Sequence, residues 1–239
     1  MARDLLVVSG GVAAPVGDTA SFADPGGTFA LRWRHYNRGR TAWELSFGYN
    51  QNKLQGAVQD TIASMEALVR QKNLLAQQQG GPGRGHVIAE FGTLEIYSLN
   101  LNILYRVSQR SRFSPVLSVG GGLYNWRVPF KIQFFDVPSF GEQHPYDPIG
   151  TDPPVYSFIF DERWVAQTID YTKHEWAGGL NAALALDLRV SRSFSVEVEG
   201  RTHLIFSSGK GNSEEQIDNQ DYLDNMVLFY LQGGFSYRF

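Results

Sequence analysis

The sequence predicts an all-β protein, a single domain over residues 1–239 that folds as an eight-stranded antiparallel up-and-down transmembrane β-barrel. Three observations lead to this fold class. Eight segments alternate apolar and polar residues with the period of two that strands have. Short and long connections between these segments alternate strictly. The apolar side chains are too large for the narrow interior of an eight-stranded barrel, so they are expected to face outward.

Six of the segments alternate clearly and carry aromatic or aliphatic residues on one face. They are Thr28–Tyr36, Thr41–Asn50, Glu95–Val107, Gly178–Val190, Phe194–Phe206 and Val227–Phe239. Two weaker segments, Leu5–Ala14 and Phe113–Val128, are rich in small residues. Several of these strands exceed the ~5–6 residues common in soluble proteins. They reach the ~9–11 residues with which a tilted strand crosses a bilayer.

The connections fall into two length classes. The short turns are basic or polar, at Asn37–Arg40, Ser108–Arg112 and Ser191–Ser193. The long loops are Pro15–Gly27, Gln51–His86, Pro129–Trp164 and Ser207–Asp221. Alternation then puts all the long loops at one end of the barrel, and the short turns with both termini at the other. This is typical of a barrel inserted from one side of a membrane, with short periplasmic turns and long extracellular loops.

The polar faces of the strands then point into the lumen. Charges there must be paired, because an unpaired buried charge costs several kcal/mol. The expected polar network of the lumen consists of Arg32, Arg34, Glu44, Asn100, Asn102, Arg106, Asp187, Arg189, Glu197, Glu199, Arg201, His203 and Arg238. We interpret this set as a salt-bridged plug that fixes strand register. The alternative is an ion-selective pore.

Composition excludes several other classes of protein. No run approaches the ~18–20 apolar residues of a membrane-spanning helix. A net charge of −3 argues against nucleic-acid binding. Without cysteine there is no disulfide or thiolate metal site, and the histidines lack metal-ligand spacing. We therefore expect no metal and no cofactor.

The second long loop contains a predicted helix over Ala57–Gln79. Its apolar residues recur every three to four positions, as on one face of a helix, and are Val58, Ile62, Met65 and Val69. This stripe is a candidate docking site for a partner protein, or a lid over the mouth of the barrel. The alternative is that it packs on the protein's own loops.

The third long loop is rich in aromatic residues and proline. Its segments Val128–Phe135 and Val155–Phe160 are expected to extend strands above the membrane, or to add a hairpin that makes ten strands. The loop then forms either an apolar contact surface or a cap packed on itself.

Glu199, His203 and Ser207 share one face of a strand and offer acid, base and nucleophile types. A base must lie within hydrogen-bond reach of its nucleophile. Residues four apart on a strand are ~13 Å apart, however. We therefore expect no catalytic site. The run Gly120–Gly122 is expected to make room for a large lumen side chain or a bend.

Three segments resemble a known family. They are Ser98–Arg106 and Arg112–Tyr124, which flank a short turn, and the final Leu231–Phe239, which ends in an aromatic residue. They are similar to segments of the small eight-stranded outer-membrane proteins of Gram-negative bacteria, of the OmpA transmembrane-domain, OmpX and OmpW type. The resemblance implies that the last strand carries the signal read by the barrel assembly machinery, at Phe235, Tyr237 and Phe239.

The resemblance also implies a bacterial outer-membrane location with the signal peptide removed, periplasmic termini, and surroundings of outer-membrane lipid and lipopolysaccharide. The leading hypothesis is a non-enzymatic structural or interaction barrel. It would display its loops to another membrane or surface protein, as a subunit of a larger assembly. The second hypothesis is a narrow porin-like channel or a conduit for small or hydrophobic solutes. A lipid-modifying barrel enzyme is the third.

Overall fold

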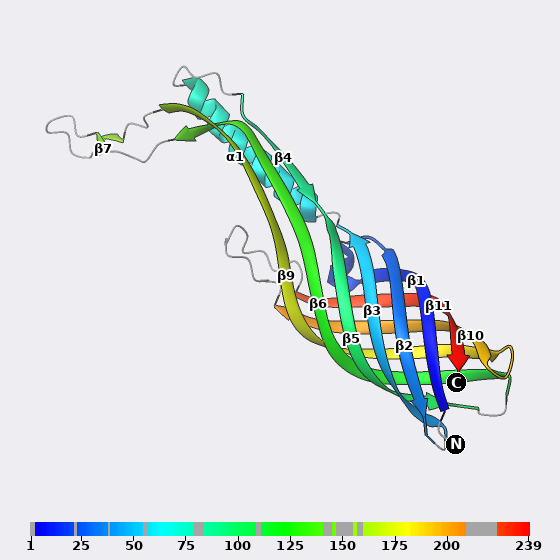
Figure 1. Ribbon diagram of the computed structural model, residues 1–239. Helices are drawn as coiled ribbons and strands as arrows, with labels where there is room; N and C mark the ends of the chain where they lie inside the picture. Colours follow the sequence, from blue (N-terminus) through cyan, green and yellow to red (C-terminus); the bar gives the residue numbers. More distant parts are fainter. Residues whose placement is uncertain are drawn as a thin grey trace. The chain divides into compact units, whose positions relative to one another are not determined.

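The computed structural model describes residues 3–21, 23–37, 39–54, 57–78, 84–108, 111–140, 145–146, 155–156, 160–208 and 224–239. The chain divides into two compact units (Figure 1). The barrel unit contains Met1–Ala57, Gly92–Pro129 and Thr172–Phe239. The loop unit contains Val58–Phe91 and Phe130–Tyr171.

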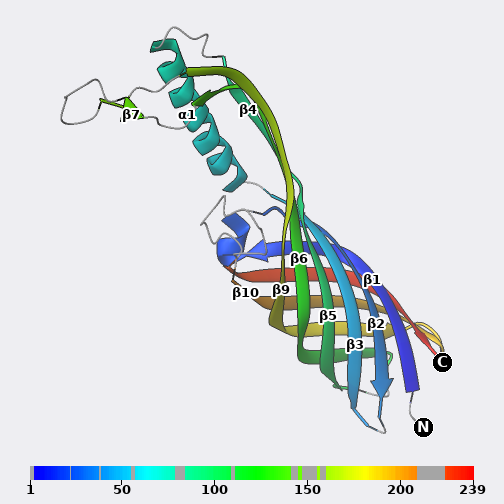
Figure 2. The ribbon, with the colours of Figure 1, turned by 60° about the vertical axis from the view of Figure 1, so that its left-hand side comes forward.

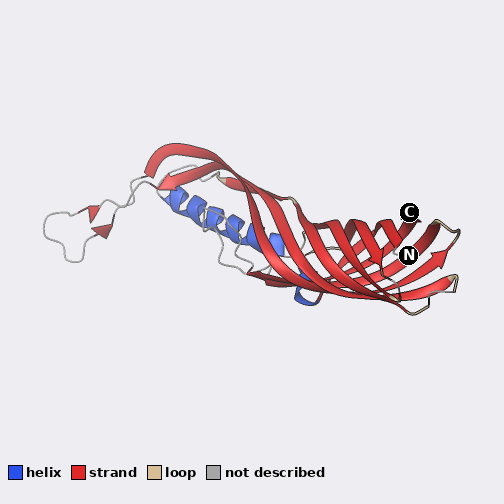
Figure 3. Cartoon of the chain, turned by 60° about the horizontal axis from the view of Figure 1, so that its bottom comes forward, coloured by secondary structure: helices blue, strands red, loops and turns tan. Residues whose placement is uncertain are grey.

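Eight long antiparallel strands form the barrel. They are β1 (Arg3–Val16), β2 (Gly26–Tyr36), β3 (Thr41–Lys53), β5 (Thr93–Arg106), β6 (Phe113–Phe140), β9 (Phe160–Arg189), β10 (Phe194–Ser208) and β11 (Asp224–Arg238). Strands adjacent in sequence pair with each other, β1 pairs with β11, and a β6–β9 pairing closes the ring. The predicted eight-stranded barrel is confirmed. Strands make up almost all of it (Figure 3).

The short turns and both termini lie at one end of the barrel (Figure 1). The alternation of the strands explains this arrangement, since each short turn follows a strand that runs in the same direction. A short 3-10 helix, η1 (Gly17–Ser21), lies in the first long loop. Thr19 of this helix accepts a hydrogen bond from the backbone N–H of Val227 at 3.0 Å. The loop is therefore tied to the start of the last strand.

The barrel is inside out. Phe235 is 72% exposed and Leu101 61%, whereas Arg201 is 5% exposed and Asn100 2%. Apolar side chains cover the outer wall and polar side chains fill much of the interior. A water-soluble barrel would have the reverse arrangement, so the outer wall is built to contact hydrocarbon.

Aromatic residues mark both edges of this apolar band. Toward the short-turn end, Trp33 and Trp43 pack edge to face with ring centroids 4.6 Å apart. Toward the other end, Tyr49 and Tyr97 lie 5.1 Å apart. Such girdles are typical of the two interfaces of a membrane barrel. Among the described residues, no helix has the length and hydropathy needed to cross a membrane.

The third loop extends two barrel strands. β6 continues to Phe140, and β9 already begins at Phe160. The alternative of ten barrel strands is wrong, because the remaining short strands, β7 (Pro145–Tyr146) and β8 (Val155–Tyr156), pair only with each other. The loop's β-forming residues lengthen existing ladders instead of opening the barrel to new strands.

The second loop contains a helix, which the sequence predicts, and a strand, which it does not. α1 (Ala57–Gln78) matches the predicted helix to within one residue. β4 (His86–Phe91) pairs with β6, with Phe91 opposite Phe130. Asn73 of α1 exchanges two hydrogen bonds with the backbone of Gly85, at 2.7 and 2.9 Å, just before β4. These bonds hold the helix beside the strand (Figure 2).

Candidate functional site: the polar interior of the barrel

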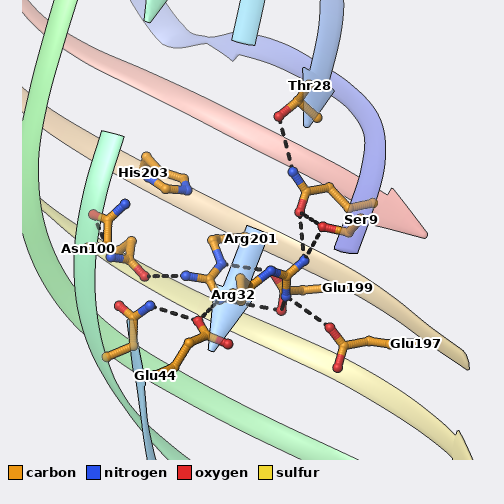
Figure 4. Close-up of polar contacts among 12 residues, drawn as sticks. Ser9, Thr28, Arg32, Glu44, Asn100, Glu197, Glu199, Arg201 and His203 are labelled. Carbon is orange, nitrogen blue, oxygen red and sulfur yellow. Dashed lines mark hydrogen bonds and ion pairs between the residues drawn. The ribbon is translucent and has the colours of Figure 1, made fainter. Parts of the chain in front are cut away.

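Six buried charges meet in the middle of the barrel. Arg32 and Arg34 come from β2, Glu44 from β3, and the other three from β10, at Glu197, Glu199 and Arg201. All point inward because they occupy alternate positions on the strand faces that oppose the apolar wall. Their contacts form a closed circuit, which we call the ionic ring. Figure 4 shows the part of it made by Arg32, Glu44, Glu197, Glu199 and Arg201.

The ionic ring alternates in charge. Glu197 binds Arg32, at 2.9 Å, and also Arg34. Glu44 binds Arg34 at 2.6 Å and Arg201 at 2.9 Å. Glu199 binds Arg201 at 2.8 Å and also Arg32, which completes the circuit. Arg34 also lies 3.6 Å from Glu199, across the ring. Each charge thus touches at least two opposite charges, and three arginines balance three glutamates.

Neutral side chains take up the remaining hydrogen-bonding groups of the ring. Arg32 Nη2 donates to Ser9 Oγ at 2.6 Å and to Gln232 Oε1 at 2.8 Å. Asn102 donates to Glu44 at 2.9 Å, and Arg201 donates to Asn181 at 3.0 Å. A buried ion pair is favourable only when such extra bonds satisfy its remaining donors and acceptors. These neutral residues come from β1, β5, β9 and β11.

A second polar cluster continues from the ring through Asn100. Tyr124 of β6 donates its hydroxyl hydrogen bond to Asn100 Oδ1 at 2.7 Å and lies 2.8 Å from His203 Nδ1. Asn181 donates to the same Asn100 oxygen at 3.3 Å. With Tyr124, every one of the eight barrel strands contributes a side chain to the connected network. The network therefore fixes the register of the whole barrel.

Glycines create the space for these side chains. A Cβ at Gly120 would lie 2.2 Å from the amide oxygen of Asn102. A Cβ at Gly122 would lie 2.5 Å from the amide oxygen of Asn100. A Cβ at Gly179 would lie 2.6 Å from the ring of Tyr124. Gly120 and Gly122 thus leave room for lumen asparagines, whereas a Cβ at Gly121 would lie 2.8 Å from the backbone oxygen of Gly179.

The three side chains on β10 that offer an acid, a base and a nucleophile have different hydrogen-bond or ion-pair partners. Glu199 belongs to the ionic ring, and His203 contacts Tyr124. Ser207 Oγ accepts from Trp126 Nε1 at 3.0 Å and donates to Glu175 at 3.0 Å. Among the described contacts, these three side chains share no hydrogen bond. This matches the expectation from their spacing along the strand.

A small apolar cluster packs inside the barrel beside the ionic ring. It consists of Leu5, Tyr36, Ala42, Leu104, Val116 and Ala185. Arg106 forms an ion pair with Asp187 and stacks over the ring of Tyr36, with its guanidinium carbon 4.7 Å from the ring centre. Arg106 and Asp187 thus form a separate pair outside the ionic ring.

Arg189 and Arg238 also lie apart from the ring. They are half-buried at the short-turn mouth, where they line a pocket with Arg112 and Arg192. Both occupy inward-facing positions of their strands. An inward-facing position does not determine how far along the barrel axis a residue lies, so these two arginines do not reach the ionic ring.

The other predicted site residues lie on exposed or partly described surfaces. Phe235, Tyr237 and Phe239 are exposed on the lipid-facing side of the last strand. On α1, Val69 is buried and Met65 half-buried, while the side chains of Val58 and Ile62 lie outside the described residues.

Sequence reasoning did not select Ser9, Tyr124 and Gln232 as members of the network. Gln232 carried a usable signal, because it lies on the polar face of the last strand. Tyr124 was harder to assign, since an aromatic residue suggests the apolar wall. Its position on the same strand face as Gly120 and Gly122 was the available clue.

Some space remains beside the ionic ring. A cavity of about 20 Å³ lies there, lined in part by Arg32, Asn100, Arg201 and His203. A volume of this size holds about one water molecule. At the level of the ring, the described interior is thus filled by paired polar side chains. Fold and interior together define a small outer-membrane-type β-barrel with a polar interior.

One solved structure with a TM-score above 0.5 agrees with this class. Neisserial surface protein A matches with a TM-score of 0.52 at 10% sequence identity, over 100% of this chain and 99% of its own. A major outer membrane protein from Thermus thermophilus has a TM-score of 0.47 at 12% identity, over 100% and 99% of the two chains. No protein-family model and no curated protein sequence matches. The predicted resemblance to small eight-stranded outer-membrane barrels is confirmed at the level of the fold.

Proposed function

We propose that the protein is a non-enzymatic outer-membrane barrel that acts through the surface of its long loops, with its interior closed to solutes. The observation that carries this proposal is the ionic ring with its neutral partners. It joins strands on opposite sides of the lumen, and the cavity beside it holds about one water molecule. An eight-stranded barrel filled in this way has no space for a hydrated ion.

The arrangement of the connections supports an interaction role. In the proposed orientation the termini and short turns face the periplasm, and the long loops project from the cell. Within the loop unit, α1 buries Val69 and Ala76 but leaves Leu68, Leu74 and Leu75 exposed. Exposed leucines on a helix that is already packed on another face favour contact with a partner protein.

Planar-bilayer recording tests the closed interior. We expect the purified protein to produce no single-channel steps. A variant in which Glu44→Ala and Arg201→Ala open the ring should raise the conductance. Single-channel steps in the unmodified protein would support the channel alternative instead.

Site-specific photo-crosslinking in intact cells tests the loop role. A photoreactive residue in place of Leu74 should give a discrete crosslinked species. The same residue in place of Arg40, which is exposed in a short turn of the barrel, is the control. Equal labelling from both positions, or none from either, would contradict a docking surface on α1.

A further inference from the structure

A basic pocket lies at the short-turn end of the barrel, apart from the ionic ring. Its volume is about 470 Å³. It is lined by Arg112, Arg189, Val190, Ser191, Arg192 and Arg238. The lining thus contains four arginines and no acidic residue.

The fold brings these arginines together from two strand ends and two short turns. The backbone N–H of Arg189, at the end of β9, donates to the carbonyl of Arg112 at 2.8 Å. The backbone N–H of Arg238, at the end of β11, donates to the carbonyl of Ser193 at 2.8 Å. The Arg238 guanidinium also donates to the carbonyl of Arg192 at 3.3 Å. Backbone pairing therefore fixes the positions from which the four side chains extend.

Two acidic side chains near this end have partners outside the pocket. Asp187, two residues before Arg189, forms an ion pair with Arg106. Asp4 contacts His35 at 2.8 Å on the outer wall. The ionic ring is balanced within itself, so it supplies no surplus negative charge. The lining of the pocket, with its four arginines, is thus positively charged.

We propose that this pocket binds a phosphate-type oxyanion. Arginine guanidinium groups present paired donors that match two oxygens of a phosphate. Ser191 Oγ accepts the backbone N–H groups of Ser193 and Phe194, at 3.3 and 3.1 Å, and its hydroxyl hydrogen can still be donated to a ligand. The site thus combines four positive charges with a neutral donor.

The surroundings of the pocket suit the phosphate of a lipid headgroup. Val190, which lines the pocket, is 66% exposed on the lipid-facing wall. Phe194 and Tyr237 lie beside it on the same wall, with ring centroids 5.2 Å apart. Acyl chains could follow this apolar surface while the phosphate contacts the arginines. A free phosphate ion would use the same polar groups without the apolar wall.

Titration calorimetry on the detergent-solubilised full chain tests the proposal. The probes are sodium phosphate, short-chain phosphatidylglycerol and, as a lipid without phosphate, short-chain diacylglycerol. The test variant carries Arg112→Gln and Arg192→Gln, both at exposed positions. The matched control carries Arg40→Gln, in another short turn, and Arg70→Gln on α1, and so loses the same charge.

We expect the test variant to bind phosphatidylglycerol at least about 10-fold more weakly than the unmodified protein, and the control to change less than about 2-fold. Binding should also weaken with added salt. Strong binding of sodium phosphate would identify a soluble oxyanion as the ligand, and binding of phosphatidylglycerol alone would identify a lipid. Both outcomes support the site.

Three results would overturn it: no binding of either phosphate probe, equal binding of diacylglycerol, or an equal loss in the control variant. Circular dichroism establishes that each variant is folded. If the double variant does not fold, the single substitution Arg192→Gln carries the same test.

Discussion

Arg34 and Glu44 face each other across the β2–β3 hairpin, and their side chains meet inside the barrel with Nε and Oε2 2.6 Å apart. This local pair joins two strands that are adjacent in sequence. The other ion pairs of Arg34 and Glu44 reach across to β10, to Glu197, Glu199 and Arg201. The hairpin thus presents a preformed pair of opposite charges on which β10 completes the ionic ring.

Removing one charge from the ring should be costly. Glu44→Gln leaves both Arg34 and Arg201 with one carboxylate fewer, and both arginines are buried. We expect a loss of about 3–5 kcal/mol in the free energy of unfolding, because an uncompensated buried charge remains. Guanidinium unfolding of the detergent-solubilised protein, followed by circular dichroism, measures this loss.

The control for this prediction is Glu66→Gln, which removes one partner of the exposed Glu66–Arg70 pair on α1. An exposed pair of this kind contributes about 0.3–0.5 kcal/mol. Similar losses from both substitutions would contradict the view that the ring is a buried, tightly coupled unit.

The strands were largely predictable from the sequence, but which charges pair with each other in the ionic ring was not. Alternation indicates which residues face inward, so Arg32, Glu199 and Arg201 could be assigned to the lumen. Alternation does not set how far distant strands are shifted along the barrel axis relative to each other. That shift decides that Arg201 meets Glu44. For the same reason Arg189 was assigned to the network, although it lies at the mouth. β4 was missed because it has only six residues next to a glycine-rich segment.

Gly179 and Gly178 offer a matched pair of substitutions on β9. A Cβ at Gly179 would lie 2.6 Å from the Tyr124 ring and 2.5 Å from the carbonyl oxygen of Leu204. At Gly178 nothing lies within 4 Å. We expect Gly179→Ala to destabilise the barrel by about 1–3 kcal/mol through overpacking. Gly178→Ala should have little effect, and the difference in unfolding midpoint between the two variants measures this. Equal effects would mean that Tyr124 does not occupy the space beside Gly179.

The Tyr124 hydroxyl should contribute measurably to stability. Tyr124→Phe removes the donor to Asn100 and the contact with His203, and leaves buried polar groups with fewer partners. We expect a loss of about 1–3 kcal/mol in unfolding free energy. The control is Tyr105→Phe on the exposed outer wall, where the hydroxyl accepts a 3.2 Å bond from Arg40. It should change stability by less than about 0.5 kcal/mol. A larger loss at Tyr105 than at Tyr124 would contradict the assignment of the polar cluster to the interior.

Leu101 provides the most direct test of the inside-out arrangement. It lies between the two aromatic girdles on β5, and its side chain is exposed on the outer wall. In a water-soluble protein, an exposed leucine replaced by arginine changes stability by about 0.5 kcal/mol or less. In a bilayer, an arginine at this depth on the lipid-facing side costs about 2–4 kcal/mol. We therefore expect Leu101→Arg to destabilise the protein strongly in lipid vesicles, measured by denaturant unfolding. Leu74→Arg, at an exposed position on α1 in the loop unit, should be nearly neutral. If Leu101→Arg were as neutral as Leu74→Arg, the outer wall would face water, and the membrane assignment would fail with it.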